Sequence, residues 1–267
     1  MESFNLILPS AALKPYVRRY WTLDAEPSQA AQRTIPTGCM QLVFHRKSRL
    51  LSLADNNFHP VAFLSGQSVC YADLLQTGSV SMVVAEFEPY GARAFFSLPL
   101  NEVNGCNVSL ADLGDSELAE LQRRVYDAES SHRAVALIEQ LLLKRLRAFN
   151  AYDYGRIQAA VLAVNRNATG GVSQLAQLSC LSSRQLNRVY AAYVGASPKQ
   201  HMRVVRFQRA LYMLQRQPET SFTQLAYDCG FYDQAHLIRE FKALSGYTPG
   251  EYLAACAPYS DYFSPAF

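Results

Sequence analysis

The stretch from Val172 to Pro198 occurs a second time, in looser form, between Phe222 and Pro249. Five matching pairs lie 51 positions apart, and they are Leu186/Leu237, Arg188/Arg239, Tyr190/Phe241, Gly195/Gly246 and Pro198/Pro249. Two earlier pairs lie 50 positions apart, namely Leu175/Leu225 and Ala176/Ala226. The second copy therefore has one extra residue in its turn. The repeat predicts two similar units, each made of a short helix, a turn and a second helix.

Each copy has the residues that a helix-turn-helix unit needs. Ala176 and Ala226 are small, which lets the backbones of two crossing helices approach each other. Ser182 and Asp233 fit the N-cap of the second helix, where a side-chain oxygen accepts hydrogen bonds from free backbone N–H groups. The apolar positions of the second helices fall on one face, and they are Leu186, Val189 and Tyr190 in one copy and Leu237 and Phe241 in the other.

The opposite face of each second helix carries candidate base-contacting residues. These are Arg184, Asn187 and Arg188 in the first copy and Gln234, Ile238 and Arg239 in the second. Arginine can bond two acceptors on guanine, and asparagine or glutamine can do the same on adenine. A single charged helix face is usually just solvated surface, but the doubling of the pattern favours two helices that read DNA.

The segment between the copies predicts one continuous helix from Pro198 to Gln215, because proline suits a first helical turn and an apolar stripe follows. Such a helix would fix the spacing of the two units. Residues on it and beside the reading faces are expected to contact DNA phosphates, and they are Ser183, Gln185, Lys199, Arg203, His236 and Lys242. Arg206 either joins them or forms an internal salt bridge with Asp228 or Glu240.

Residues from about Arg156 to Tyr252 resemble the DNA-binding domain of AraC/XylS-type transcription regulators. The most specific strings are in the second copy, and they are Leu225–Gln234, Phe241-Lys242 and Gly246–Tyr252. The resemblance implies seven helices, with two helix-turn-helix units joined by one long helix, and reading helices in successive major grooves about 34 Å apart. Ala235 and Ile238 depart from the polar residues usual at those positions, which implies thymine-methyl and phosphate contacts by the second unit.

The charge distribution divides the chain into two expected domains. Residues 150–256 hold eleven Lys or Arg against six Asp or Glu, whereas residues 1–149 hold fourteen against fifteen. The basic excess therefore lies in the part assigned to DNA. We expect a β-rich effector-binding or oligomerisation domain with a helical extension at 1–149, the double helix-turn-helix domain at 150–256, and an aromatic tail at 257–267.

The N-terminal part is expected to be a small antiparallel β-barrel or sandwich, so the whole chain is of the α+β class. Short apolar runs from Met40 to His45, Val61 to Leu64 and Val80 to Phe87 predict strands, because Pro, Gly and Asn cluster between them. Two amphipathic helices follow, from Ser116 to Asp127 and from His132 to Phe149. The second of these helices either packs on its own sheet or forms a dimer interface.

A fainter resemblance, to a β-rich N-terminal domain of some AraC-type regulators, covers residues 6–113. Its matching pieces are Leu13–Trp21, Ile35–Phe44, Gly66 and Phe87–Gly91. Domains of this kind bind effectors or oligomerise in that family. Six aromatic residues are candidates for an effector pocket, although the core of the sheets is the simpler explanation for them: Tyr20, Trp21, Phe44, Phe63, Phe87 and Tyr90.

Six cysteines, at positions 39, 70, 106, 180, 229 and 256, form no C-x-x-C pair. The start of the chain lacks a secretory signal, and no run approaches the roughly 20 apolar residues that span a bilayer. We therefore expect reduced thiols, a cytoplasmic location and no membrane contact.

No pattern for a cofactor or a catalytic metal is present. His45 and His59 lack partners at metal-binding spacing, and neither a phosphate-binding glycine loop nor a nucleophile elbow occurs. Three classes remain: a ligand-responsive regulator, a regulator whose N-terminal domain binds only proteins, and an enzyme that accepts alkyl groups on a thiol. We expect the first, with double-stranded promoter DNA, RNA polymerase, a small-molecule effector and a second copy of the chain as candidate partners.

Overall fold

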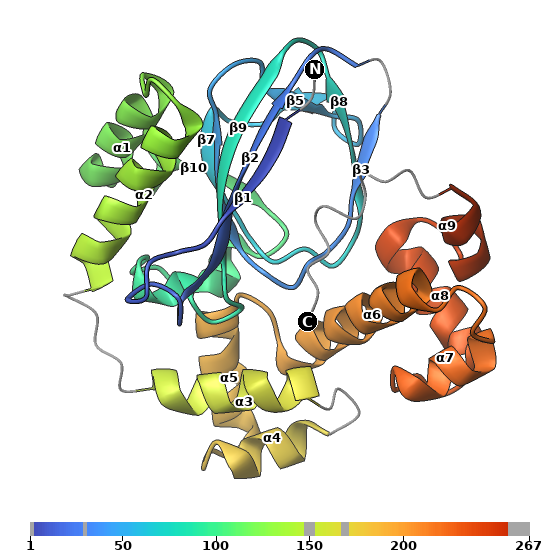
Figure 1. The fold of residues 1–267 in the computed structure, drawn as a ribbon. Helices are drawn as coiled ribbons and strands as arrows, with labels where there is room; N and C mark the ends of the chain where they lie inside the picture. The colour runs from blue at the N-terminus through green and yellow to red at the C-terminus, as the bar shows by residue number, and fades with distance from the viewer. Residues whose placement is uncertain (1–2, 29–30, 147–152, 167–170, 256–267) are drawn as a thin grey trace.

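The computed structural model describes residues 3–28, 31–146, 153–166 and 171–255 (Figure 1). Up to residue 146 the chain forms two antiparallel sheets with two α-helices beside them, and from residue 153 it is entirely helical. This arrangement confirms the expected α+β class. None of the helices in the described ranges combines the length and the apolar character that crossing a bilayer requires.

The larger sheet has six strands in the order β1–β2–β9–β4–β7–β10. Its strands are β1 (Ser3–Ile7), β2 (Val17–Ala25), β4 (Gln41–His45), β7 (Ala62–Ser65), β9 (Val80–Phe87) and β10 (Asn107–Ser109). The smaller sheet has the order β3–β8–β5–β6, and its strands are β3 (Gln32–Thr34), β5 (Leu50–Ser52), β6 (Asn57–Phe58) and β8 (Ala72–Gln76). Two separate sheets are what the sandwich alternative predicts.

The three strands predicted from sequence correspond to β4, β7 and β9, whereas the others were not predicted. Strand β2 shows why, because Arg18, Arg19 and Asp24 interrupt its apolar pattern. In the folded chain the Arg19 guanidinium lies 2.9 Å from the carboxylate of Glu86 on the neighbouring β9. The pairing lets a charged residue sit inside a sheet where the hydrophobic pattern alone predicts none.

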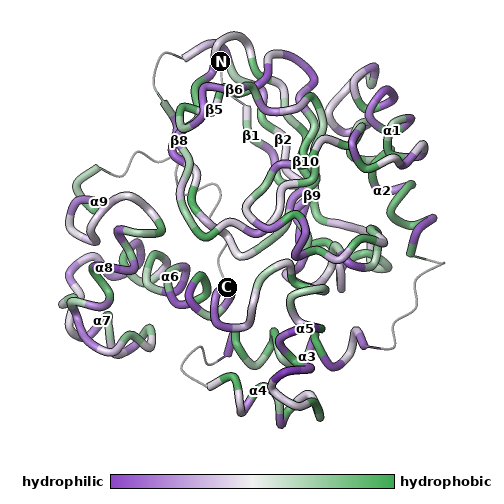
Figure 2. The backbone as a smooth tube through the Cα atoms, turned by 180° about the vertical axis from the view of Figure 1, so that it is seen from behind, coloured by the Kyte–Doolittle hydropathy of each residue, from purple (hydrophilic) through white to green (hydrophobic). Residues whose placement is uncertain are grey.

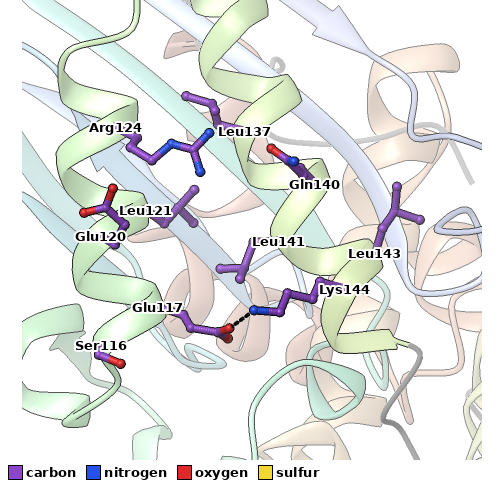
Figure 3. A pocket seen from close by; sticks show the side chains of 10 residues that line it. All are labelled: Ser116, Glu117, Glu120, Leu121, Arg124, Leu137, Gln140, Leu141, Leu143 and Lys144. Atoms are coloured by element: carbon purple, nitrogen blue, oxygen red, sulfur yellow. Dashed lines mark hydrogen bonds and ion pairs between the residues drawn. The ribbon is translucent and has the colours of Figure 1, made fainter.

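Helices α1 (Ser116–Tyr126) and α2 (Ser131–Leu146) cover one face of the larger sheet (Figure 1). Their buried residues, such as Leu121 and Ile138, share one apolar cluster with strand residues such as Phe44. Of the two alternatives for the second helix, the structure therefore shows packing on its own sheet. A groove of about 660 Å³ with a charged rim, including the Glu117–Lys144 ion pair, runs between the two helices (Figure 3).

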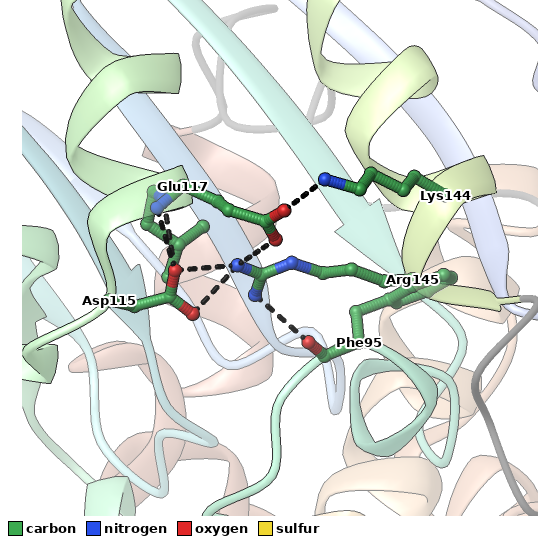
Figure 4. A network of polar contacts seen from close by, with 6 residues as sticks. Phe95, Asp115, Glu117, Lys144 and Arg145 are labelled. Atoms are coloured by element: carbon green, nitrogen blue, oxygen red, sulfur yellow. Dashed lines mark hydrogen bonds and ion pairs between the residues drawn. The ribbon is translucent and has the colours of Figure 1, made fainter.

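Arg145, at the end of α2, holds the start of α1 in place (Figure 4). Its guanidinium donates to both carboxylate oxygens of Asp115 at 2.7 Å and to the carbonyl of Phe95 at 3.1 Å. Asp115 is also the N-cap of α1, since its side chain accepts from the backbone N–H groups of Glu117 and Leu118. One carboxylate thus caps one helix and anchors the other.

The residues from 153 to 255 form seven helices within the described ranges, as the resemblance implies. They are α3 (Tyr154–Arg166), α4 (Val172–Leu178), α5 (Ser183–Val194), α6 (Pro198–Arg216), α7 (Phe222–Asp228), α8 (Gln234–Ser245) and α9 (Pro249–Ala255). We call α4 with α5 the first unit and α7 with α8 the second unit. The 19 residues of α6 span about 28 Å at 1.5 Å per residue, and both views place the units near its two ends (Figures 1 and 2).

The sequence repeat is also a repeat of backbone conformation. The turn of the first unit covers residues 179–182 and that of the second covers 229–233, which is the extra residue that the spacing predicts. Cys180 and Gly230 both have left-handed backbones, with φ of 52° and 79°. In both turns the next residue donates back to the small alanine of the first helix, from Leu181 to Ala176 and from Phe231 to Ala226. The two units thus share one closing geometry.

Gly195 ends α5 with φ of 83° and packs against the N-terminal part of the chain. A Cβ placed there would lie 3.2 Å from the carbonyl oxygen of Leu100. We expect Gly195→Ala to destabilise the protein by at least about 1–2 kcal/mol, the cost of a left-handed alanine, with a further cost from this contact. Gly114→Ala is the matched control, because its φ of 64° is similar and a Cβ there meets nothing within 4 Å. Equal losses in denaturant melts of both variants would show that the Leu100 contact has no effect.

Candidate nucleic-acid interface

The helices that carry the candidate reading residues begin at well-defined caps. The Ser182 hydroxyl accepts from the backbone N–H of Gln185, and the Gln185 side chain accepts in return from the backbone N–H of Ser182. At the start of α8, the Asp233 carboxylate accepts from the backbone N–H of His236 at 2.6 Å. These caps fix where each helix begins and therefore which residues of its first turns face outward.

The outer face of α5 is open to solvent. Arg184, Asn187 and Arg188 are all exposed, while Leu186 and Tyr190 on the opposite face are fully buried. Neither arginine forms an ion pair with another residue of the described ranges. The Asn187 amide donates to the Ser183 carbonyl at 2.8 Å, so it must release this bond before it can pair with a base.

The outer face of α8 is less polar than that of α5. Gln234 and Arg239 are exposed and Ile238 is half-buried. The side-chain oxygen of Gln234 accepts from the Thr223 hydroxyl on α7 at 2.8 Å, which links the two helices of the second unit. Arg239 keeps its guanidinium free of ion pairs with other described residues.

The candidate phosphate contacts divide into two groups. Ser183, Lys199 and Lys242 are exposed at the surface. Three others are engaged within the protein, and they are Gln185 in the cap of α5, His236 with the backbone N–H of Tyr232, and Arg203 in an ion pair with Glu240. Arg203 thus already has a partner on α8, and a phosphate contact by this side chain stays a prediction.

Arg206 and Arg209 of α6 also point into the protein rather than toward solvent. Arg209 donates to the Asn165 carbonyl at 2.7 Å, and Arg206 donates to the Gly230 carbonyl at 3.4 Å. The salt bridge to Glu240 that the sequence offered to Arg206 is made by Arg203, one helical turn earlier. Helical periodicity places both residues on one side of α6, so only the packed structure separates them.

Two exposed tyrosines of the second unit were not predicted from the sequence as site residues. Tyr232 in the turn is 85% exposed and Tyr227 on α7 is 68% exposed, both unusual for side chains of this size. A tyrosine hydroxyl is a common donor to DNA phosphates. The sequence repeat contains one signal for Tyr232, because the extra residue of the second copy lies in the turn that carries this tyrosine.

The N-terminal part contacts both units. On the first, the Asn104 side chain donates to the Gly195 carbonyl after α5. On the second, Arg33 donates to the Ser245 carbonyl at the end of α8 and lies over the ring of Tyr247, 4.5 Å from its centre. The Arg33 guanidinium also donates two hydrogen bonds of 2.7 Å to the carboxylate of Asp73.

A buried histidine lies directly behind α5. The Nδ1 atom of His201 is 2.6 Å from the Tyr190 hydroxyl, and burial lowers the pKa of His201 from 6.5 to about 4. Unfolding therefore takes up a proton between these two pH values. The free energy of unfolding should fall as the pH falls through this range, by up to about 1.4 kcal/mol per pH unit for one such group. Burial also lowers the pKa of His45 to about 4, which adds to the fall.

Thermal melts at a series of pH values test this expectation. His201→Gln should show a shallower loss of melting temperature below neutral pH than the parent, whatever its stability at neutral pH. His132→Gln is the control, because His132 is exposed on α2. Identical slopes for the parent and His201→Gln would contradict the assignment.

A cavity of about 260 Å³ lies between the two sheets, and only some of the candidate pocket residues line it. Trp21 and Phe63 do. Tyr20, Phe44 and Phe87 lie instead in the cluster under α1 and α2, and Tyr90 packs edge-on against Tyr154 of α3 at 5.2 Å. For these four the core, which the sequence offered as the simpler explanation, is where the structure places the side chains. On β2, the successive residues Tyr20 and Trp21 point to opposite faces of the sheet.

The lining of the cavity includes thiols, and one of them is held in its protonated form. Cys39 lies in its wall, and burial raises the pKa of this thiol to about 12. A thiol held protonated is a poor acceptor of alkyl groups. Within the described ranges, no group of three His, Cys, Asp or Glu residues is placed to hold a metal ion.

Comparison with known families assigns the two parts of the chain separately. Residues 175–255 match a helix-turn-helix domain family, and residues 5–109 match a domain family of unknown function, DUF6597. The chain is 29% identical over 131 residues to the HTH-type transcriptional regulator ArgR of Pseudomonas aeruginosa, covering 44% of this chain and 40% of that protein. It is 28% identical over 132 residues to the arabinose operon regulatory protein of Escherichia coli, covering 46% and 44%.

An uncharacterized HTH-type transcriptional regulator of Haemophilus influenzae is 26% identical over 162 residues, covering 56% of this chain and 54% of that protein. The chain thus spans about half the length of these curated relatives, or less. Among solved structures, it is similar to ToxT of Vibrio cholerae at 12% identity and a TM-score of 0.45, covering 93% of this chain and 99% of that one. It is similar to an AraC-type regulator of Chromobacterium violaceum at 28% identity and a TM-score of 0.36, covering 39% and 95%.

The family match and the named relatives agree with the geometry of the two units. The matched residues 175–255 include both turns, both capped second helices and the whole of α6. The relatives are regulators of transcription rather than enzymes. Residues 175–255 therefore form a helix-turn-helix domain, and the chain is similar to HTH-type transcriptional regulators.

Proposed function

We propose that this chain is a sequence-specific DNA-binding regulator that inserts α5 and α8 into adjacent major grooves near a promoter. The repeat at 51 positions supports the proposal, because it produces two capped helices with outward polar faces on one block. Base contacts are assigned to Arg184, Asn187 and Arg188 on α5 and to Gln234, Ile238 and Arg239 on α8. Phosphate contacts are assigned to the exposed Ser183, Lys199 and Lys242, with Tyr232 as an addition.

The two units would contribute differently to sequence recognition. Arg184 and Arg188 give α5 two bidentate donors for guanine. On α8, Ala235 and Ile238 present methyl groups beside Arg239, which suits thymine. We therefore assign most hydrogen-bonded readout to the first unit and shape or methyl contacts to the second.

The N-terminal part is proposed to control this DNA binding in response to a small ligand. The cavity between the sheets favours this role over one in which the part binds only proteins. Two sheets packed without a cavity would suffice for protein binding alone. The division into domains at residues 1–149 and 150–256, with a tail at 257–267, belongs to the same proposal; the tail lies outside the described residues. The proposal also includes a cytoplasmic location, a homodimer and contact with RNA polymerase.

Fluorescence anisotropy on DNA tests the proposal. The full chain is titrated into the intergenic fragment upstream of its own gene and into a scrambled fragment of equal length, over a series of salt concentrations. A preference for the native fragment, together with a fall in affinity as salt rises, is the expected result. Equal affinity for both fragments at every salt concentration would exclude sequence-specific binding at that site.

A further inference from the structure

The walls of the cavity between the sheets offer no permanent charge, since their one imidazole, that of His59, has a pKa lowered by burial. Among the side chains that line it there is no Asp, Glu, Lys or Arg within the described residues. The apolar part comes from both sheets and includes Trp21, Phe63 and Leu74. An ionised ligand would lose its hydration there without gaining a partner of opposite charge.

One polar side chain of the cavity wall is buried without a partner. Gln76 is 4% exposed, and neither its side-chain oxygen nor its nitrogen forms a hydrogen bond. An unsatisfied buried amide costs free energy, and a ligand group that accepts and donates hydrogen bonds would recover it. Gln76 is the last residue of β8, whose other inward residues Ala72 and Leu74 also line the cavity.

We propose that this cavity binds an uncharged, mainly aromatic or aliphatic molecule whose hydroxyl, carbonyl or amide group pairs with Gln76. The inference rests on the proposed function, since it names the class of ligand for the proposed control site. A volume of about 260 Å³ suits a molecule with one ring and a short side chain better than a large cofactor.

The wall of the cavity is also the surface on which the second unit rests. Ile35 lines the cavity and belongs to the apolar cluster of α6, α7 and α8. The next residue, Pro36, accepts a hydrogen bond from Gln208 of α6. Tyr71 lines the cavity as well, and its ring lies 4.3 Å from the Arg33 guanidinium that contacts Ser245 and Tyr247. An occupant of the cavity would therefore touch residues that also contact the helical part of the chain.

Three probes with one carbon skeleton test the ligand class: trans-β-methylstyrene, cinnamyl alcohol and cinnamate. The readout is the emission of Trp21, which is the sole tryptophan of the chain and lines the cavity. At neutral pH, cinnamyl alcohol should bind at least tenfold more tightly than cinnamate. Gln76→Leu should remove the preference for cinnamyl alcohol over trans-β-methylstyrene while keeping the binding of the latter.

Two variants of β8 locate the binding. Ala72→Phe fills the cavity and should weaken cinnamyl alcohol binding at least tenfold, whereas Leu75→Phe, on the other face of the same strand, should leave it unchanged. Any of three results would overturn the proposal. They are cinnamate binding as tight as that of cinnamyl alcohol, unchanged binding of cinnamyl alcohol by the Ala72→Phe variant, and a Trp21 emission that none of the three probes changes. The titrations contain no DNA, so their outcome is separate from that of the anisotropy test of DNA binding.

Discussion

Replacing Phe241 by alanine is expected to destabilise the second unit by about 3–5 kcal/mol, the usual cost of removing a buried phenylalanine ring. Phe241 is fully buried on the inner face of α8. Its ring lies 5.1 Å from that of Phe207 on α6 and 5.6 Å from that of Tyr252 on α9, both edge to face. The substitution therefore removes the contact that joins three helices.

Hydrogen exchange of the α8 amides measures this loss locally. Faster exchange in α7, α8 and α9, with α5 little changed, is the expected pattern, because the apolar cluster around Phe241 is separate from that around Tyr190. Lys242→Ala is the control. Lys242 is the exposed neighbour of Phe241 on the same helix, so its replacement should change the free energy of unfolding by less than about 0.5 kcal/mol. Equally faster hydrogen exchange in both units would mean that they unfold together.

Replacing both Arg188 and Arg239 by alanine is expected to cost about 2–6 kcal/mol of binding free energy on the cognate DNA. Each arginine that pairs with a base contributes about 1–3 kcal/mol. They lie on different helices at matching positions of the repeat, so their losses should add. Anisotropy titrations of both single variants and the double variant give the three values.

The same titrations on scrambled DNA separate base contacts from phosphate contacts. If the arginines read bases, the double variant loses far more affinity on cognate DNA than on scrambled DNA. Arg133→Ala, on the exposed face of α2, removes one positive charge outside the interface and should change neither value beyond the general effect of charge. Equal losses on both DNAs would assign Arg188 and Arg239 to the phosphates instead.

The helical half of the chain could be predicted well because its signals are local. The spacing of 51 fixed the correspondence between Gly195 and Gly246, and both have left-handed backbones. Proline at position 198 predicted the start of α6 at that residue. Caps, left-handed glycines and helical periodicity all depend on residues within a few positions of one another.

The site residues were harder to predict, because their roles depend on packing between distant segments. Arg203 and Arg206 look equivalent in the sequence, yet only Arg203 meets Glu240. Tyr20 and Trp21 are neighbours, yet one lies under α2 and the other in the cavity. Strand alternation would separate these two aromatics once β2 is identified, but the charged residues Arg18 and Arg19 interrupt its apolar pattern.

Both units are proposed to read one face of a duplex from a fixed distance. This proposal is tested by inserting about five base pairs, half a helical turn, between the two halves of the bound site. Anisotropy titrations on the original and the extended site then compare affinities. The extended site should bind no better than a site with one half scrambled, because α6 cannot lengthen or twist to follow the displaced groove. Full affinity for the extended site would contradict a rigid two-helix reader.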